Sequence, residues 1–402
     1  MMGCRKRHMG PKGFQAAGIA CGIKAAAGAK DLALIYSEAP AQVAGLFTSN
    51  RVKAAPVLVT RQRVRRGTCR GVIVNSGNAN ACTGEQGFKD AEAMAQATAA
   101  ALGIPPRQVL VASTGVIGHP LPLERVEGGI PALVTQLSAD GFADAAEAIM
   151  TTDTRPKIIT ERVVVGGDEI TVLGMAKGAG MIHPQLATML AFIMTDASIE
   201  AHELSTLLHE GVRSTFNRIT IDGDTSTNDM ILLMANGAGS TRTLHPDESR
   251  WRPFQEALFT VMDYLARAIV RDGEGRTKVV EIVVRGAKGV RDAERVAFRT
   301  AHSPLVKTAF FGHDPNWGRI MAAVGSAGVS FDPQKVSIFF DDVVVVEKGM
   351  AASGVDEGSQ RRVLQQEEFT VTIDLHAGSA QASVLTTDLS HQYVTINAAY
   401  HT

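Results

Sequence analysis

Short apolar runs of strand length alternate with longer stretches of helical spacing along the whole chain. Val109–Ala112 is typical of the first kind, and Trp251–Val270 is typical of the second. This alternation favours an α/β or α+β architecture. A chain of 402 residues suits two or three domains, or one large α/β unit. We find neither a repeat of fixed period nor a long linker rich in Ser, Gly or Pro.

Individual elements can be placed from the same periodicities. The Ala-rich stretch Glu85–Leu102 predicts a helix, because it is built from good helix formers and ends at Gly103. The turn residues Gly166-Gly167-Asp168 predict a hairpin. Its expected arms are Arg162–Val165 and Ile170–Leu173. Further strands are expected at Gly71–Val74, Met189–Met194, Val279–Val284, Val336–Phe340, Phe369–Leu375, Ala382–Leu385 and Tyr393–Ile396.

Charge, hydropathy and cysteine usage exclude several functional classes. The chain has 40 basic and 41 acidic residues, so it lacks the positive excess that a nucleic-acid partner requires. No stretch approaches the ~20 apolar residues that cross a bilayer, and Gly10–Gly13 interrupts the basic N-terminus before any signal-peptide core. The four cysteines form no C-x-x-C pair. We therefore expect a cytoplasmic protein with reduced thiols and no membrane partner.

The common cofactor and metal motifs are absent. The chain contains no G-x-x-x-x-G-K-[ST], no H-E-x-x-H and no G-x-S-x-G, which leaves no support for a P-loop, a zinc site or a nucleophile elbow. Asp222, Asp224 and Asp229 are potential Mg²⁺ ligands. The simpler interpretation is a polar turn whose side chains cap the backbone. We predict no metal and no resident cofactor.

One segment, Lys177–Leu190, combines features that suit covalent chemistry. A Gly-rich loop leads to Ala187, then to Thr188, and then to an apolar strand. A threonine hydroxyl needs an adjacent base to become a good nucleophile. Cleavage of the chain just before Thr188 would free an α-amine, whose pKa of about 7.7–8 suits that task. From these residues alone, an ordinary strand start remains the simpler alternative.

The same segment resembles the cleavage site of the ornithine acetyltransferase family of arginine biosynthesis, also called the glutamate N-acetyltransferase family. The resemblance extends from Gly13 to Thr402. The other segments that carry it, in order, are Gly13–Gly18, Leu46–Asn50, Val74–Asn80, Ser113–Gly118, Thr151–Thr154, Phe216–Thr220, Asp222–Asp229, Arg271–Gly275 and Asp314–Arg319. Several long motifs in the same order make the resemblance specific.

The resemblance implies a self-cleaving acetyltransferase. Cleavage between Ala187 and Thr188 would leave an α chain of residues 1–187 and a β chain of residues 188–402. Thr188 would then carry acetyl from N²-acetylornithine to glutamate in a ping-pong reaction. The implied fold is a layered α/β/β/α-type sandwich with mixed sheets, in which both chains form one folded unit. The implied assembly is a heterotetramer of two α and two β chains.

The resemblance also implies roles for individual residues. Thr114 and Gly115 match the oxyanion-hole pair. The implied substrate contacts are Thr151, Lys177, Thr188, Glu274, Asn397 and Thr402. Lys177 suits a carboxylate and Glu274 suits an ammonium group, which agrees with amino-acid substrates.

The chain departs from the family pattern at His183, Arg276, Ala399 and His401. The last two lie in the C-terminal segment, so the contacts expected there are the least secure.

Two other functions remain open at this point. One is an N-terminal-nucleophile amidohydrolase or aminopeptidase of similar fold, in which water accepts the acyl group. The other is an uncleaved amino-acid-binding protein. For the acetyltransferase, we also expect acetyl-CoA to serve as a second acetyl donor, since the chain matches the general bacterial pattern of the family.

Overall fold

The strands of the chain form two mixed sheets, one 8-stranded and one 6-stranded. The structure is a computed structural model that describes residues 10–183, 189–354 and 356–399. Each sheet belongs to its own unit. Unit 1 comprises the described residues up to Asn217 together with Asp224–Ile269, and unit 2 comprises Arg218–Gly223 and the described residues from Val270 onward.

The sheet of unit 1 has the strand order β4-β3-β2-β8-β7-β6-β5, with β1 beside β2. Its strands are β1 (Phe14–Ile19), β2 (Leu32–Phe47), β3 (Thr68–Asn78), β4 (Val109–Val116), β5 (Lys157–Val165), β6 (Asp168–Lys177), β7 (Leu190–Thr195) and β8 (Met230–Ala235). The pairs β3–β4 and β7–β8 are parallel, whereas the other pairs are antiparallel.

Strand β2 connects two halves of this sheet. It pairs with β3 from Leu32 to Tyr36 and, after a register shift, at Ala41 and Gln42. It pairs with β8 from Gln42 to Phe47. The two halves enclose one core, since Val72 and Leu110 from one half cluster with Met175 and Phe192 from the other. Unit 1 therefore contains two packed β layers.

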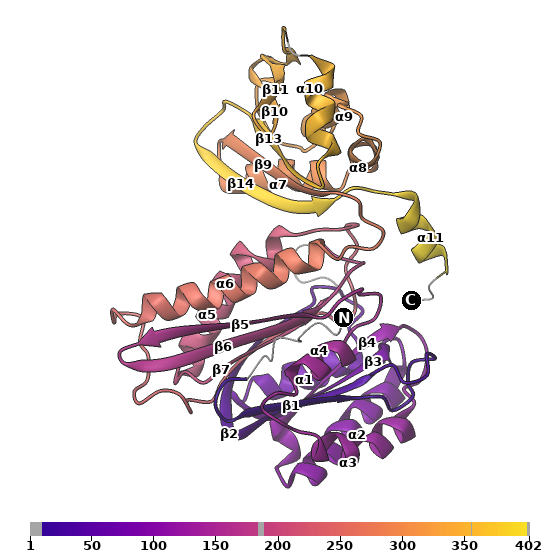
Figure 1. Cartoon of the computed structure of the whole chain (residues 1–402), viewed down its shortest axis with the longest axis vertical. Helices are drawn as coiled ribbons and strands as arrows, with labels where there is room; N and C mark the ends of the chain where they lie inside the picture. Colours follow the sequence, from indigo (N-terminus) through magenta and orange to yellow (C-terminus); the bar gives the residue numbers. More distant parts are fainter. Residues whose placement is uncertain (1–9, 184–188, 355, 400–402) are drawn as a thin grey trace, which may run out of the picture. The chain divides into compact units, whose positions relative to one another are not determined.

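Helices cover the outer faces of both β layers (Figure 1). On one side, α2 and α3 pack on β2, β3 and β4 through a second apolar cluster. On the other side, α6 lies so close to β6 that a Cβ on Gly174 would stand 2.5 Å from Val261 Cγ1. The helices of unit 1 are α1 (Ala55–Val64), α2 (Gly84–Leu102), α3 (Leu123–Thr135), α4 (Phe142–Ala148), α5 (Ala201–Ser214) and α6 (Trp251–Val270). The predicted mixed-sheet α/β/β/α layering is confirmed.

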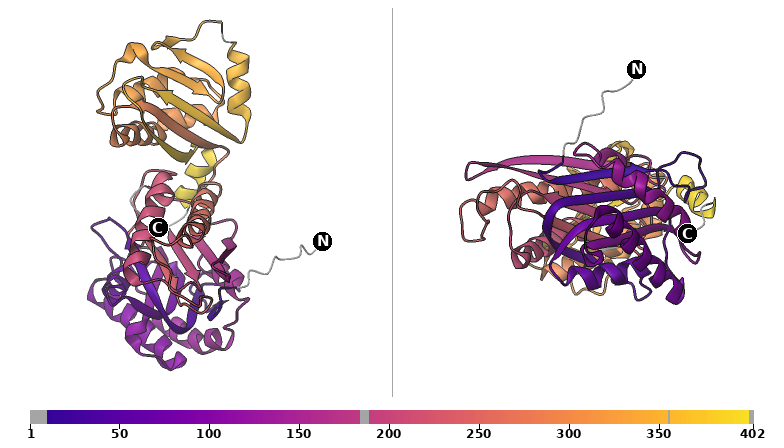
Figure 2. Two further views of the ribbon diagram at one scale, coloured as in Figure 1. Left: turned by 90° about the vertical axis from the view of Figure 1, so that its left-hand side faces the viewer. Right: turned by 90° about the horizontal axis from the view of Figure 1, so that it is seen from below.

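The predicted hairpin is also present, as the long pair β5–β6 (Figure 2). Gly166 and Gly167 form its turn with φ angles of 62° and 97°. Both values lie in the left-handed region that glycine adopts without steric cost, which explains why these two residues stand there.

Unit 2 is built on a sheet with the order β12-β11-β10-β13-β9-β14. Along β9, Val280, Ile282 and Val284 face an apolar core that is shared with helices α7 to α10. The elements are β9 (Val279–Ala287), α7 (Val290–Ala301), α8 (Pro304–Phe311), α9 (Trp317–Gly325), β10 (Ser337–Phe340), β11 (Val343–Glu347), β12 (Met350–Ala351), α10 (Glu357–Gln365), β13 (Glu368–Asp374), β14 (Ala380–Thr387) and α11 (His391–Ala399). Short 3-10 helices occur at Pro106–Gln108, Phe216–Arg218 and Pro333–Lys335.

One predicted element is wrong. Tyr393–Ile396 was expected to be a strand, but it lies within helix α11. Tyr393 and Ile396 are three residues apart, so in a helix they share a face, and both are half-buried there, whereas Val394 is 60% exposed. A run of four residues fits both the two-residue period of a strand and the 3.6-residue period of a helix. In the helix, Tyr393 contacts Asp222 and Asn397 contacts Glu274. No helix among the described residues is long and apolar enough to cross a membrane.

Candidate active site

The predicted oxyanion-hole pair lies near the end of β4, where the chain passes very close to β3. Thr114 is only 6% exposed. Gly115 pairs with Gly77 in the parallel register and has a φ angle of 132°. A Cβ on Gly115 would stand 2.4 Å from the carbonyl carbon of Gly77, so no other residue fits without moving the backbone. The glycine at position 115 is thus required by the local packing.

Lys177 ends β6 and brings three of the predicted site residues together. Its side chain is buried, and its Nζ donates hydrogen bonds to Thr151 Oγ1 at 2.7 Å and to Thr114 Oγ1 at 3.3 Å. The Thr114 hydroxyl accepts from Lys177, so its own proton stays available for a second partner. The site therefore places one cation and a hydroxyl donor beside the Gly115 backbone.

Asp153 holds this cation in place. Its fully buried carboxylate accepts hydrogen bonds from Lys157 Nζ at 2.6 Å and from the Gly178 N–H at 2.7 Å, and it lies 4.0 Å from Lys177 Nζ. Burial by itself raises the pKa of Asp153, but the charges of Lys177 and Lys157 and the Gly178 N–H outweigh it and lower the pKa to about 2. The carboxylate is therefore ionised at neutral pH and compensates the two buried lysines.

We expect Asp153→Asn to destabilise unit 1 strongly, because it leaves buried lysines without a counter-charge. Breaking a buried ion pair typically costs about 3–5 kcal/mol in the free energy of unfolding. The folded-state pKa of about 2 lies below the ordinary value of 3.8, so this stabilisation is fully present above pH ~4 and is lost as the pH falls through about 2. Urea unfolding at neutral and acidic pH measures the difference, which should shrink on acidification.

Asp168→Asn is the matched control, because this carboxylate lies at the surface and accepts hydrogen bonds from the N–H and the hydroxyl of the exposed Thr241. Equal unfolding free energies for wild-type protein and Asp153→Asn at neutral pH would show that the buried network does not stabilise the unit.

The start of β7 lies beside this group of residues. Lys177 pairs with Leu190 in the antiparallel register of β6 and β7. The Met189 N–H donates to Asp229 Oδ1 at 2.9 Å. The predicted cleavage-site residues Ala187 and Thr188 lie outside the described residues, as does Thr402. By its position in the sequence, Thr188 directly precedes the anchored residue Met189.

Two other predicted site residues meet in unit 2. Asn397 Nδ2 donates to Glu274 Oε2 at 2.8 Å. The contact joins the loop after α6 to helix α11. Glu274 is half-buried and Asn397 is exposed, so the pair is open to a ligand from solvent.

Several contacts hold the Glu274 loop against α11. Asp388 accepts the N–H groups of Thr277 and Lys278 at 2.8 and 2.9 Å. The Ser390 hydroxyl donates to the Gly275 carbonyl. Gly275 has a φ angle of 64°, and a Cβ there would stand 2.3 Å from the Tyr393 nitrogen. The Glu274–Asn397 contact is therefore set by the backbone packing around Gly275.

Among the departures from the family pattern, Arg276 has a clear structural place. Its guanidinium lies 2.8 Å from Glu367 and donates to the Arg271 carbonyl at 2.6 Å. These contacts occupy the side chain on the surface of unit 2 and leave the Glu274–Asn397 contact undisturbed.

The acidic residues considered as metal ligands do not gather. Asp224 is exposed in unit 1, Asp229 is fully buried there, and Asp222 accepts a hydrogen bond from the Tyr393 hydroxyl at 3.2 Å in unit 2. Within the described ranges, no three His, Cys, Asp or Glu side chains are arranged to hold a metal ion.

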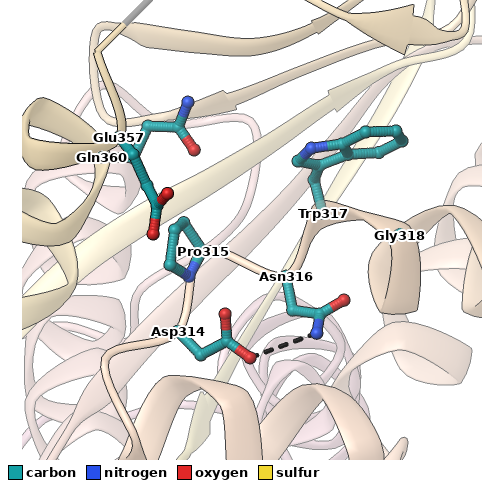
Figure 3. Close-up of a pocket in the computed structure, with 7 residues that line it drawn as sticks. All are labelled: Asp314, Pro315, Asn316, Trp317, Gly318, Glu357 and Gln360. Carbon is teal, nitrogen blue, oxygen red and sulfur yellow. Dashed lines mark hydrogen bonds between the residues drawn. The ribbon is translucent and has the colours of Figure 1, made fainter.

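Unit 2 also has a pocket of about 450 Å³ between the loop that starts α9 and the first turn of α10 (Figure 3). Its acidic groups already have partners: Asp314 accepts from Asn316 at 3.1 Å, and Glu357 accepts from Arg361 at 2.7 Å. None of the predicted site residues lines it. The lining residues are Asp314, Pro315, Asn316, Trp317, Gly318, Glu357 and Gln360.

Sequence reasoning missed Asp153 as part of the site and took Asp229 only as a turn residue or metal ligand. Asp153 stands in the quoted motif Thr151–Thr154, four residues before Lys157. An acidic residue inside a motif with hydroxyl neighbours was a usable signal. Asp229 also ends a quoted motif with hydroxyl neighbours, Asp222–Asp229, so the same signal was present, although nothing in the sequence indicated that its carboxyl group is buried.

Comparison with known proteins identifies the family of the chain. A model of the ArgJ family matches residues 15–402. The chain is 50% identical over 393 residues to the arginine biosynthesis bifunctional protein ArgJ of Symbiobacterium thermophilum, covering 98% of each chain. The Geobacter sulfurreducens protein of that name is 50% identical over 394 residues, covering 98% of this chain and 100% of the relative. A crystal structure of ArgJ from Bacillus halodurans matches with a TM-score of 0.50 and 38% identity, covering 52% of this chain and 98% of its own. The chain therefore belongs to the ArgJ family and is an acyltransferase of arginine biosynthesis.

Proposed function

We propose that the chain cleaves itself between Ala187 and Thr188 and then transfers acetyl from N²-acetylornithine to glutamate through an acyl-threonine. The observation that carries the proposal is the buried Lys177 ammonium, which contacts both Thr114 and Thr151 and lies opposite the start of β7. A fixed cation, a hydroxyl donor and a close backbone turn are what a developing oxyanion requires.

Self-cleavage begins with attack of Thr188 Oγ on the carbonyl carbon of Ala187. The C–N bond breaks as the C–O bond forms, and the hydroxyl proton passes to the departing nitrogen. Water then hydrolyses the ester, which leaves a carboxylate on Ala187 and a free α-amine on Thr188.

Both products would remain in one folded unit. Strands β6 and β7 lie on either side of the cleavage site and pair over six residues, from Val172–Thr195 to Lys177–Leu190. Cutting the connection leaves these hydrogen bonds in place. The Bacillus halodurans match supports cleavage near the middle of the sequence, because it covers 52% of this chain and 98% of that one.

In the transfer reaction, Thr188 Oγ attacks the acetyl carbon of N²-acetylornithine. The α-amine of Thr188 takes the hydroxyl proton and delivers it to the leaving nitrogen, so that ornithine departs and an acetyl ester remains. The amine of glutamate then attacks this ester, the C–O bond breaks, and N-acetylglutamate leaves. Thr114 and Gly115 stabilise the oxyanion in both halves.

Lys177 in unit 1 and Glu274 in unit 2 each suit one charged group of an amino-acid substrate. The Lys177 ammonium suits the substrate carboxylate, whereas the Glu274 carboxylate suits an ammonium group. Thr151, Asn397 and Thr402 complete the proposed contacts. The relatives from Symbiobacterium thermophilum and Geobacter sulfurreducens are named bifunctional proteins, which supports acetyl-CoA as a second acetyl donor.

The test combines mass spectrometry with an acetyl-transfer assay on the purified protein. Scaling 42.6 kDa by chain length predicts fragments of about 20 and 23 kDa in place of the 402-residue chain. Glutamate should be acetylated with N²-acetylornithine as the donor, and also with acetyl-CoA alone. Release of free acetate without N-acetylglutamate would favour an amidohydrolase, and an intact, inactive chain would favour a binding protein.

Native mass spectrometry of the same sample tests the assembly, for which we propose a heterotetramer of two α and two β chains. A single αβ pair at working concentration would contradict it.

A further inference from the structure

Asp229 is a buried acid that the proposed reaction does not use. It directly precedes β8, and its side chain is 0% exposed. Unlike Asp153, it has no lysine within ion-pair distance among the described residues. The neighbouring hydroxyl groups of Thr48 and Ser226 act on this carboxyl group, whereas the amide of Asn228 is engaged elsewhere, because Asn228 Nδ2 donates to the Ser113 carbonyl at 2.8 Å.

The carboxyl group of Asp229 fixes the start of β7. Its Oδ1 accepts the Met189 N–H at 2.9 Å. The backbone adds two further bonds: Met230 N donates to the Met189 carbonyl at 3.1 Å, and Thr48 N donates to the Asp229 carbonyl at 3.0 Å. Met189 is therefore held through both its N–H and its carbonyl oxygen. It follows Thr188 directly in the sequence.

The second oxygen of the carboxyl group is not needed for this anchoring. Throughout the part of the chain that the structure describes, no donor makes a hydrogen bond to Asp229 Oδ2, although the atom is buried. Burial raises the pKa of Asp229 well above its usual value, and the Met189 N–H and the charge of Lys177 offset this only in part. The direction of this shift means that the site favours the protonated acid more than water does, because burial penalises the charged form.

We propose that Asp229 is a positioning residue that fixes the Thr188 nucleophile through its hydrogen bond from the Met189 N–H. The inference rests on the proposed function, because it needs Thr188 to be the reacting residue. A nucleophile in a near-attack geometry loses about 10²-fold in rate when it is misplaced by 1 Å. An anchor on the adjacent peptide unit controls that geometry without contacting the substrate.

The experiment compares Asp229→Ala, Asp229→Asn and Asp196→Ala in the full chain. Asp196 is the matched control, because it is equally buried, follows the other end of β7, and accepts the N–H groups of Thr171 and Lys12 at 2.8 and 2.9 Å. The readouts are the fraction of cleaved chain by mass spectrometry, kcat and KM for N²-acetylornithine, and the urea midpoint of unfolding.

Asp229→Ala should slow self-cleavage and lower kcat by about 10²-fold, because Met189 loses its anchor, while KM stays within about threefold. Asp229→Asn keeps a side-chain oxygen that can accept the Met189 N–H, so it should cleave and turn over within about threefold of wild type. Asp196→Ala should lower the urea midpoint but leave cleavage and kcat unchanged.

Three results would overturn the inference. Wild-type cleavage and kcat in Asp229→Ala would show that the anchor is dispensable. Loss of activity in a folded Asp229→Asn would show that an oxygen acceptor for the Met189 N–H is not what the reaction needs from residue 229. Equal losses of kcat in Asp196→Ala and Asp229→Ala would show that the lower rate comes from a less stable β7 and not from the position of Thr188. If wild-type protein neither cleaves nor transfers acetyl, the proposed function itself fails, which is a separate outcome.

Discussion

Thr188→Ala is expected to remain a single 402-residue chain and to transfer no acetyl group. The substitution removes the hydroxyl that attacks Ala187 and, later, the acetyl carbon. No fragments of about 20 and 23 kDa should form, because without Oγ there is no acyl shift. Mass spectrometry of the purified chain and an assay of N-acetylglutamate formation measure both losses.

Thr188→Ser is the matched variant, because it keeps the hydroxyl and removes only the methyl group. We expect it to cleave and to transfer acetyl at a reduced rate, since the smaller side chain is held less firmly in one rotamer. Thr195→Ala, at the other end of β7, loses a buried hydroxyl that accepts only the nearby Ala197 N–H at 3.2 Å. It should leave both reactions intact. Cleavage or transfer in Thr188→Ala would refute the acyl-threonine mechanism.

Thr114→Ala is expected to lower kcat by 10²–10³-fold, which corresponds to about 2.7–4 kcal/mol for the loss of one oxyanion donor. KM should change little, because the oxyanion exists only in the transition state and the intermediate. The change also removes the acceptor that lies 3.3 Å from Lys177 Nζ, so part of the loss reflects a less firmly held cation. Steady-state kinetics with N²-acetylornithine separates kcat from KM.

Thr98→Ala is a suitable control for this variant. Thr98 is also buried in unit 1, but its hydroxyl donates only to the Met94 carbonyl of its own helix, at 2.8 Å. It should change stability without changing kcat, whereas Thr114→Ser should restore most of the rate. A rise in KM with unchanged kcat in Thr114→Ala would assign this residue to substrate binding instead of oxyanion stabilisation.

Much of the fold was predictable because the relevant signals are local. Helix α6 spans Trp251–Val270 as its apolar spacing predicts, and the Gly166-Gly167 turn joins the hairpin β5–β6. The failure at Tyr393–Ile396 has the opposite cause. Its four residues fit both the strand period and the helix period. The helix is stabilised by contacts of Tyr393 with Asp222 and of Asn397 with Glu274, which lie more than a hundred residues away in the sequence.

Some residues of the candidate site could be predicted from the sequence, whereas others could not. Thr114, Lys177 and Glu274 were identified by motifs that resemble those of a known family, so they were available from the sequence. Asp153 and Asp229 were missed because their properties arise from burial. The low pKa of Asp153 depends on two lysines that approach it in the fold, and the raised pKa of Asp229 depends on the absence of water around it.

The sequence by itself determined the α/β class, the family and the identity of the hydroxyl and charged residues that suit acyl transfer, since each of these is encoded in short runs or ordered motifs. Only the tertiary structure decided which of those residues share a site. In the folded chain, β2 connects the two β layers, and Lys177 donates hydrogen bonds to Thr114 and Thr151. The fold also buries Asp229 next to Met189. The physical reason is that burial and electrostatic coupling depend on distances between residues far apart in the chain, and those distances exist only once the sheets have packed.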